Sequence, residues 1–251
     1  MNLSIDINCD MGEGYGQDVE LMPFITSANI ACGFHAGNAM IMQRTVAQAV
    51  KYGVAIGAHP SLPDRDNFGR KPIQITPEEV YAITLYQIGA LHAFAKAEGT
   101  TLQHVKPHGA LYNMAAKDLL LAQAIAKAVA DFNSQLILFG LANSALIMAA
   151  KEMKLAYCHE VFADRTYQAD GSLSPRDKEG ALIGDIGKSI DQVIQIVTTK
   201  TVNTLEHTTI RIQADTVCIH GDGAHALPLA KALYERLTIS GIGLAAPTER
   251  I

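Results

Sequence analysis

The chain alternates short apolar runs with longer amphipathic stretches from its beginning to its end. Such alternation is typical of strand–helix units, in which parallel strands form a sheet covered by helices. The short runs are apolar on both faces, as buried parallel strands are. The expected strands are Leu3–Cys9, Asn29–Cys32, Val54–Ala58, Leu102–Lys106, Leu136–Phe139, Ala156–Phe162 and Thr216–His220.

Amphipathic helices are expected between these strands. The clearest is Pro77–Glu98, because Thr76 can cap it and Glu79 completes a capping box. Gly99 follows where a helix-ending glycine belongs. A small additional strand is expected at 207–213. The other expected helices are Ala39–Tyr52, Lys117–Phe132, Ser144–Lys154, Lys188–Thr199 and Ala224–Ile239.

The number of strand–helix units sets the fold class. About seven units fit the 251 residues, so we expect a single α/β domain over residues 1–251, folded as a seven-stranded (β/α) TIM-like barrel. A doubly wound open sheet has the same periodicity, because periodicity does not show whether a sheet closes. Hydrophobic residues make up 49% of the chain and charged residues 18%, which permits a large core.

Composition excludes several classes of protein. The formal net charge of -5 argues against a nucleic-acid surface, which would be strongly basic. No apolar run reaches the roughly 18 residues of a membrane span, and the beginning of the chain lacks a basic, apolar leader, so we expect a cytoplasmic protein. The oligomeric state stays open, homo-oligomers included. Buried, reduced thiols are expected for Cys9, Cys32, Cys158 and Cys218.

Familiar catalytic motifs are absent from the sequence. It has no G-x-x-x-x-G-K-[ST] loop for nucleotide phosphates, no G-x-S-x-G elbow and no H-E-x-x-H. The remaining reactive residue types are acids, imidazoles, lysine and arginine. These side chains suit proton transfer, oxyanion stabilisation or a metal-activated water.

Acids and histidines gather where the expected strands end. In α/β barrels the loops after the strands converge on one face, where catalytic groups assemble. We therefore expect these distant residues to meet in one pocket. The histidines at such positions are His35, His59, His104, His108, His159, His220 and His225. The acids are Asp10, Glu13, Glu160, Asp164 and Asp222.

The first strand carries the most informative alternation. Asp6, Asn8 and Asp10 are spaced by two and therefore share one face. In a barrel this face points inward, where polar groups are costly unless they are paired. A structural network would explain them, but Asp10 and Glu13 at the strand exit favour a functional site.

Basic residues in the later loops suggest an anion site. Arg70 and Arg165 can each grip a carboxylate or phosphate with two parallel hydrogen bonds. A surface ion pair with Asp164 is the alternative for Arg165. Asp222 either caps the last helix or takes part in catalysis.

Six blocks of the sequence resemble the LamB/YcsF family, in the same order and over residues 3 to about 245. One departure is Asn38, where the family usually has Asp; asparagine keeps the shape but cannot ionise. The blocks are residues 6–13 (DINCDMGE), 27–37 (SANIACGFHAG), 57–60 (GAHP), 105–112 (VKPHGALY), 160–165 (EVFADR) and 220–222 (HGD).

The resemblance implies ATP-dependent cleavage of 5-oxo-L-proline to L-glutamate, with ATP as co-substrate and subunits B and C as partners. It also implies a seven-stranded barrel like that of the glycoside hydrolase/deacetylase superfamily. Members of that superfamily often bind a divalent metal ion through an Asp and two His. By this analogy Asp10, His59 and His108 would hold the metal, with His104 as a substitute.

Roles follow for a reaction that opens a cyclic amide. Asp10 and His59 would position or deprotonate water, and His108 and Lys106 would stabilise the oxyanion or a phosphate. Arg70 or Arg165 would hold the substrate carboxylate. The residues expected to orient these groups or to shuttle protons are Glu13, His35, Glu160 and Asp222.

Two other functions fit the same residues. One is a metal-dependent deacetylase or sugar-processing barrel that does not use ATP. The other is a non-catalytic subunit that presents substrate to subunits B and C, which Asn38 slightly favours because its amide cannot ionise.

Overall fold

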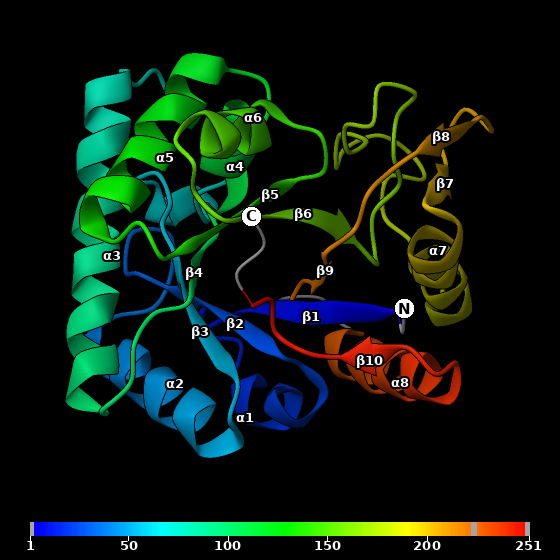
Figure 1. Cartoon of the computed structure of the whole chain (residues 1–251), viewed down its shortest axis with the longest axis horizontal. Coiled ribbons are helices and arrows are strands. Elements are labelled where there is room, and N and C mark those ends of the chain that lie inside the picture. The colour runs from blue at the N-terminus through cyan, green and yellow to red at the C-terminus, as the bar shows by residue number, and fades with distance from the viewer. Residues whose placement is uncertain (1–2, 222–224, 249–251) are drawn as a thin grey trace.

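The computed structural model describes residues 3–221 and 225–248. Its centre is a parallel barrel with the strand order β1-β2-β3-β4-β5-β6-β9 (Figure 1). Strand β9 also pairs with β1, in the register Asp6 to Thr216 and Cys9 to Ile219, and this pairing closes the barrel. The predicted seven-stranded barrel is therefore confirmed, and the open sheet is wrong. The strands are β1 (Ser4–Met11), β2 (Ser27–Ala31), β3 (Ala55–His59), β4 (His104–Val105), β5 (Ile137–Leu141), β6 (Tyr157–Phe162) and β9 (Thr216–Ile219).

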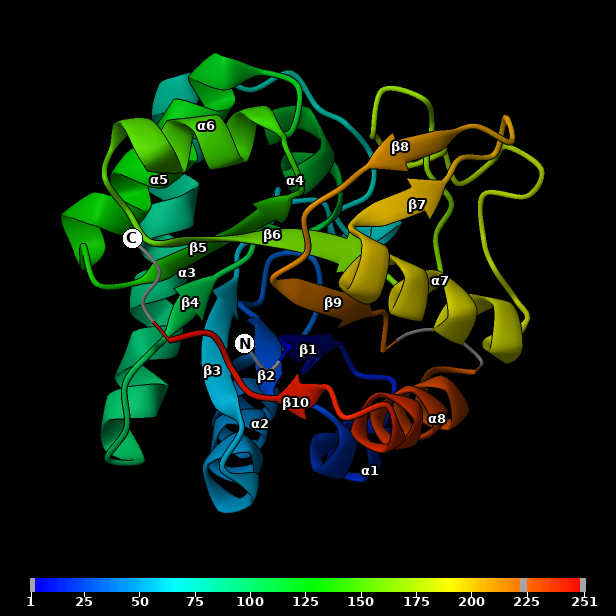
Figure 2. The same ribbon diagram turned by 45° about the vertical axis from the view of Figure 1, so that its right-hand side comes forward.

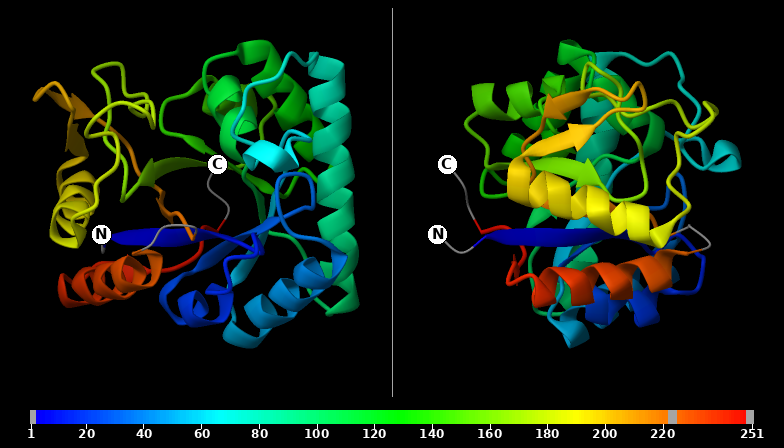
Figure 3. Two further views of the ribbon diagram at one scale, coloured as in Figure 1. Left: turned by 180° about the vertical axis from the view of Figure 1, so that it is seen from behind. Right: turned by 90° about the vertical axis from the view of Figure 1, so that its right-hand side faces the viewer.

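Helices surround the barrel (Figure 2). Helix α3 packs against α5, and α7 packs against α8 (Figure 3). The predicted capping box is present: Thr76 Oγ1 accepts from the Glu79 amide at 3.2 Å, and Glu79 Oε2 accepts from the Thr76 amide at 2.8 Å. The long helices are α2 (Ala39–Tyr52), α3 (Pro77–Ala97), α5 (Leu119–Phe132), α6 (Ala145–Glu152), α7 (Ile186–Thr199) and α8 (Ala226–Ile239).

The small additional strand predicted at 207–213 is present as β8 (Thr209–Arg211), which pairs antiparallel with β7, outside the barrel. Other short elements were not predicted. Strand β10 adds to the beginning of β1. The elements that were not predicted are α1 (Asp18–Leu21), η1 (Met22–Phe24), η2 (Arg65–Asn67), α4 (Gly109–Ala115), β7 (Thr201–Asn203) and β10 (Gly243–Leu244).

The two faces of β1 have opposite chemistry. Its apolar side chains join the core between barrel and helices, among them Ile5 and Ile7. Its polar side chains are buried inside the barrel, as the alternation predicts. All four cysteines are buried and unpaired, which confirms their prediction. In the described part of the chain, no helix combines the length and the apolar character that crossing a bilayer requires.

The floor of the barrel is a hydrogen-bonded polar layer. Asp6 accepts from the hydroxyls of Ser27 and Thr216 at 2.7 and 2.5 Å. Burial raises the pKa of Asp6 to about 6, although these hydrogen bonds act in the opposite direction. Above this layer, Asn29 Nδ2 donates to Asn8 Oδ1 at 2.7 Å, and His104 Nε2 donates to Asn29 Oδ1 at 2.8 Å. These hydrogen bonds link Asp6, Asn8, Asn29 and His104 to neighbours inside the barrel, and they support the layer above them.

Gly57 in β3 makes room for the His104 ring. A Cβ atom built at Gly57 would lie 2.0 Å from His104 Nε2. We expect Gly57→Ala to lower the free energy of unfolding by at least about 2 kcal/mol, because the ring must move and leave Asn29 unpaired. Urea denaturation measures this change.

Gly89 provides the matched control. It lies inside α3, and a Cβ atom there meets nothing within 4 Å. Gly89→Ala should raise stability by about 0.5–1 kcal/mol, because alanine favours helix. Equal stability of wild type and Gly57→Ala would contradict the close packing of His104 on β3.

Candidate active site

A cavity of about 480 Å³ opens at the carboxyl ends of the barrel strands. Its lining includes side chains that end or directly follow β1, β3, β4, β6 and β9, namely Asp10, His59, Lys106, Phe162 and His220. This is the face on which barrel enzymes assemble their catalytic groups. The pocket therefore collects residues from across the sequence, as the strand-end pattern predicts.

Lys106 lies at the centre of the buried charges. Its Nζ is 2.9 Å from both Asp10 Oδ1 and Glu160 Oε1, and 3.0 Å from Cys218 Sγ. Burial alone would lower the pKa of Lys106, but Asp10, then Cys218 and Glu160, raise it well above its ordinary value. Lys106 is therefore a cation fixed between two carboxylates.

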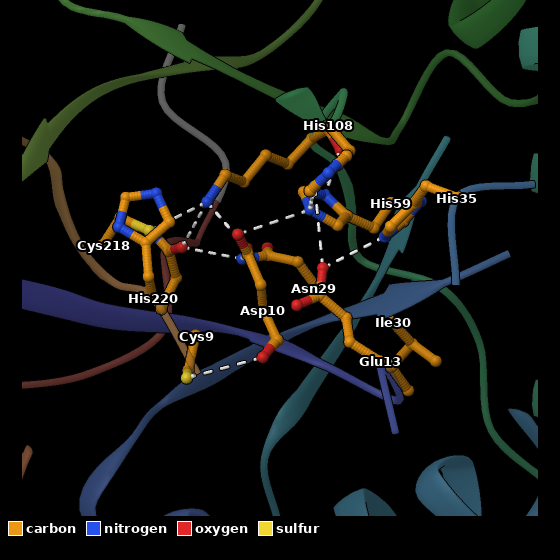
Figure 4. Close-up of polar contacts among 12 residues, drawn as sticks. Cys9, Asp10, Glu13, Asn29, Ile30, His35, His59, His108, Cys218 and His220 are labelled. Atoms are coloured by element: carbon orange, nitrogen blue, oxygen red, sulfur yellow. Dashed lines mark hydrogen bonds and ion pairs between the residues drawn. The ribbon is translucent and has the colours of Figure 1, made fainter. Parts of the chain in front are cut away.

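Asp10 is held in its ionised form. Burial alone would raise its pKa, but His59 and then Lys106 keep the pKa of Asp10 well below its ordinary value. Asn29 Nδ2 also donates to Asp10 Oδ1 at 2.8 Å. The other carboxylate oxygen, Oδ2, lies 3.4 Å from His59 Nε2. One oxygen of Asp10 is thus anchored, and the other faces the histidines (Figure 4).

His59 and His108 face each other through bare nitrogens. His59 Nδ1 lies 2.7 Å from the Lys106 carbonyl oxygen, and His108 Nε2 lies 2.9 Å from the Phe68 carbonyl oxygen. A carbonyl oxygen only accepts, so each of these nitrogens carries the proton of its ring. The remaining nitrogens, His59 Nε2 and His108 Nδ1, are 2.9 Å apart. Two lone pairs at this distance call for a cation or a shared proton between them.

Glu13 and His35 stand behind this pair. Glu13 Oε1 is 3.0 Å from His35 Nε2 and 3.6 Å from His108 Nδ1. The His35 ring stacks on His108, with centroids 3.8 Å apart. Burial lowers the pKa of His35 to about 2, and burial followed by His35 lowers the pKa of His108 well below its ordinary value. Both rings are therefore neutral, which suits metal ligation better than a shared proton.

The cluster has the donor atoms of a divalent-metal site. Glu13, His35, His59 and His108 each offer one ligand atom, and these atoms lie within 4.8 Å of one another. The carbonyl bonds that fix the tautomers of His59 and His108 are the outer contacts usual for metal-binding histidines. Asp10 adds a carboxylate oxygen beside His59. These residues fit a metal such as zinc, which takes imidazole and carboxylate ligands.

A second histidine–acid pair, His220 with Asp164, lies across the pocket; both were expected at strand ends, but neither was assigned a catalytic role from the sequence. His220 Nδ1 is 2.9 Å from Asp164 Oδ2, and its Nε2 is 3.0 Å from Arg176 Nη2. Burial would raise the pKa of Asp164, but His220 first, and then Arg176, lower it. The sequence signal for this pair was the position of His220 at the end of its strand. The hydrogen bond with Asp164, 56 residues away in the sequence, fixes the orientation of the His220 ring.

The predicted residues divide into three groups. Asp10, His59, Lys106 and His108 line the pocket together with Arg70 and Arg165. Glu13 and His35 contact this group from behind, whereas Glu160 lies beneath Lys106 inside the barrel. The structure does not bring every expected residue to the pocket. Asp222 falls outside the described residues.

His159 lies away from the pocket. It alternates with the inward Glu160 on β6, so it lies on the outer face, where its Nδ1 accepts from the Asn143 amide at 3.3 Å. The expectation that it joins the site is wrong, because strand parity decides the direction of a side chain. His225 is exposed before α8 and lines a neighbouring cavity together with Asp164, Arg176 and His220.

Asn38 has a structural place. Its Oδ1 accepts from the Ile41 amide at 2.9 Å and caps α2. Asparagine and aspartate cap helices about equally well. The exchange of Asp for Asn at this position therefore keeps the cap and leaves the pocket residues unchanged.

Comparison with known proteins places these motifs in context. The model of the LamB/YcsF family matches residues 5–251. The chain is 55% identical over 249 residues to the A subunit of 5-oxoprolinase from Oceanobacillus iheyensis, covering 97% of each chain. It is 41% identical to a lactam utilization protein of known structure from Thermus thermophilus, with a TM-score of 0.93 over 98% of this chain and 100% of that one.

A more distant structure shares the fold alone. The catalytic domain of a peptidoglycan N-acetylglucosamine deacetylase from Eubacterium rectale superposes with a TM-score of 0.53 at 12% identity. The superposition covers 99% of this chain and 90% of that domain. The deacetylase-like barrel expected from the sequence is therefore present.

Replacing Lys106 tests the central charge cluster. In the wild type the pKa of Asp10 is lowered, so its contribution to stability is fully present above the ordinary value of 3.8. Without the lysine this buried carboxylate binds its proton more tightly, and its ionised form costs stability as the pH rises. We expect Lys106→Met to lose about 3–5 kcal/mol at pH 8 and clearly less at pH 5.

Lys127 serves as the control for this measurement. It forms an exposed ion pair with Asp131 within α5. Lys127→Met should leave the free energy of unfolding nearly unchanged at either pH, because water screens an exposed ion pair. A Lys106→Met deficit that is small, or equal at pH 5 and pH 8, would argue against a buried cation between ionised carboxylates.

Proposed function

This chain belongs to the LamB/YcsF family, and we propose that it is the hydrolytic subunit of an ATP-dependent 5-oxoprolinase, which cleaves 5-oxo-L-proline to L-glutamate. The observation that carries the proposal is the meeting of Asp10, His59 and His108 in one strand-end pocket. The near-identical length and the name of the Oceanobacillus relative support the substrate. The name of the Thermus protein also refers to a lactam.

Opening a lactam requires three catalytic functions from the pocket. A water oxygen bonds to the carbonyl carbon while its proton leaves, the carbonyl oxygen becomes negative, and the ring nitrogen departs with a new proton. Asp10 and His59 would position the water and take its proton, since Asp10 is ionised and one of its oxygens faces His59. His108 has no N–H left for the oxyanion, because its Nε2 donates to the Phe68 carbonyl, so it would act on the oxyanion through a metal ion held at its bare Nδ1.

Lys106 acts mainly through Asp10. Its Nζ has four close partners, Asn8, Asp10, Glu160 and Cys218, for three N–H groups. It therefore keeps the base ionised and correctly placed. Its positive charge, at the pocket wall, also favours negative charge developing on the substrate.

His220 and Asp164 are placed to serve the third function, protonation of the departing ring nitrogen. Asp164 accepts from His220 Nδ1 and thereby orients the ring. A ring nitrogen of His220, a carboxylate oxygen of Asp10 and Cys218 Sγ lie within 4.8 Å of one another, so acid and base share the pocket. Because its Nε2 accepts from Arg176, His220 would first take up the proton that the water releases and then pass it to the departing nitrogen. Arg70 is the candidate for the substrate carboxylate.

A divalent metal belongs to this proposal. Asp10, His59 and His108 would hold it, with Glu13 in reach of His108. When bound, such an ion lowers the pKa of water and polarises a carbonyl oxygen. The neutral rings of His35 and His108 and the fixed tautomers of His59 and His108 support this assignment.

In this proposal, the use of ATP belongs to the complex with subunits B and C. The sequence contains no P-loop, so we assign ATP-dependent activation of the lactam to subunits B and C. The deacetylase alternative is supported by a fold likeness alone. The alternative of a non-catalytic subunit loses the support of Asn38, since that side chain caps a helix.

Activity of the reconstituted complex tests the proposed function. With subunits B and C, ATP and 5-oxoproline, Asp10→Asn and His108→Ala should each lower kcat by roughly 10²–10⁴-fold, because each removes a group that acts on the water or the oxyanion. Glutamate release measures the rate, and circular dichroism verifies folding.

Asn38→Asp is the matched control and should keep its rate within about twofold, because aspartate caps α2 equally well. Full activity of folded Asp10→Asn and His108→Ala would establish a non-catalytic subunit instead. Release of acetate from an acetylated amino sugar, without ATP, would favour the deacetylase.

Metal binding by the purified chain is a separate prediction. We expect one divalent ion per chain, measured with Co²⁺ by absorption and with Zn²⁺ by calorimetry. His59→Ala and His108→Ala should weaken binding by at least about tenfold, since each removes a ligand. His207→Asn is the control, because His207 is exposed, has a positive φ that asparagine tolerates, and lies in the β7–β8 turn. Equal affinity in all variants would refute the assigned ligands.

A further inference from the structure

One side of the pocket carries an excess of positive charge. The basic residues of its lining are Arg70, Lys106, Lys117, Arg165 and Arg176, whereas the acidic residue in the described lining is Asp10. Asp10 pairs with Lys106. Nearby Asp164 pairs with His220, and its charge also acts on Arg165 and Arg176. The described lining therefore carries more basic than acidic side chains.

Arg165 is the most constrained of these cations. Its residue is only 5% exposed, and its Nη2 donates to the Ser174 carbonyl at 2.5 Å. Among the described residues, its buried Nε has no hydrogen-bond partner. A buried, charged donor without a partner is costly, so the position of Arg165 is explained best by a ligand.

Arg176 lies close enough to act on the same ligand. Burial, and then the charge of Arg176, lowers the pKa of Arg165 to about 10, with a further contribution from Arg70. Arg176 Nη2 also reaches His220 Nε2 at 3.0 Å, which places it at the edge of the hydrolytic residues. Like charges gathered at one wall are stabilised when an anion binds between them.

We propose that Arg165 and Arg176 form a subsite for a phosphoryl dianion, next to the residues that open the lactam. The forked guanidinium group matches phosphate oxygens, and two such groups balance two negative charges. Arg70 is the candidate for a carboxylate. The pocket is thus built for a molecule with two anionic groups, whereas 5-oxoproline alone has one.

The identity of that molecule rests on the proposed function. A lactam phosphorylated on its carbonyl oxygen carries both a carboxylate and a phosphoryl group. The reaction that supplies it must be an ATP-dependent phosphorylation, which we assign to the partner subunits. The phosphoryl subsite itself can be tested on this chain alone.

The test is binding of methyl phosphate to the purified wild-type chain at pH 8, measured by isothermal titration calorimetry. We expect saturable binding at one site, and binding roughly 10- to 100-fold weaker in Arg176→Gln, because a charge-assisted hydrogen bond is lost. Arg165→Lys keeps the charge but removes the fork, and should weaken binding similarly. Lys178→Gln, in the same connection but paired with exposed Glu206, should bind like the wild type.

Three outcomes overturn the subsite. The wild type shows no saturable binding of methyl phosphate, or Arg176→Gln and Arg165→Lys both bind it as tightly as the wild type does. The third outcome is that acetate binds the wild type as tightly as methyl phosphate and displaces it. The proposed function fails differently, through a reconstituted wild-type complex that releases no glutamate. Methyl phosphate binding can survive that failure, so the two results are separable.

Discussion

The site depends on one buried ion cluster, in which Lys106 holds Asp10 and Glu160 inside the barrel. Bringing these charges out of water is costly, and the cost is offset only while each remains paired. The lysine follows β4, the acids come from β1 and β6, and the barrel must close for them to meet. Closure of the barrel is therefore required to keep Asp10 ionised.

The strand-end pattern predicted most of the architecture, because it depends on local periodicity. Helix α2 was expected and found at Ala39–Tyr52, and the alternation of polar residues on β1 correctly predicted a polar barrel interior. The strand-end pattern alone could not predict that His159 points outward, since strand parity decides that. It also could not pair Asp164 with His220, which depends on the neighbouring positions of β6 and β9.

Backbone carbonyls, rather than charges, set the chemistry of the central histidines. The carbonyls of Lys106 and Phe68 accept hydrogen bonds from His59 and His108, and so turn the unprotonated nitrogens toward each other. This choice of tautomer was invisible in the sequence, because any residue supplies a carbonyl. It leaves two strand-end histidines with unprotonated nitrogens that face each other at the pocket.

Arg165 and Arg176 both lie on the long connection between β6 and β9, which also carries α7 and the β7–β8 hairpin. The residues that we propose to act on the water belong instead to β1, β3 and the segment after β4. Exchanges in the crossover that keep Asp164, which orients His220, would therefore alter which molecules are admitted. Protein engineers could vary the rest of this connection to redirect the barrel.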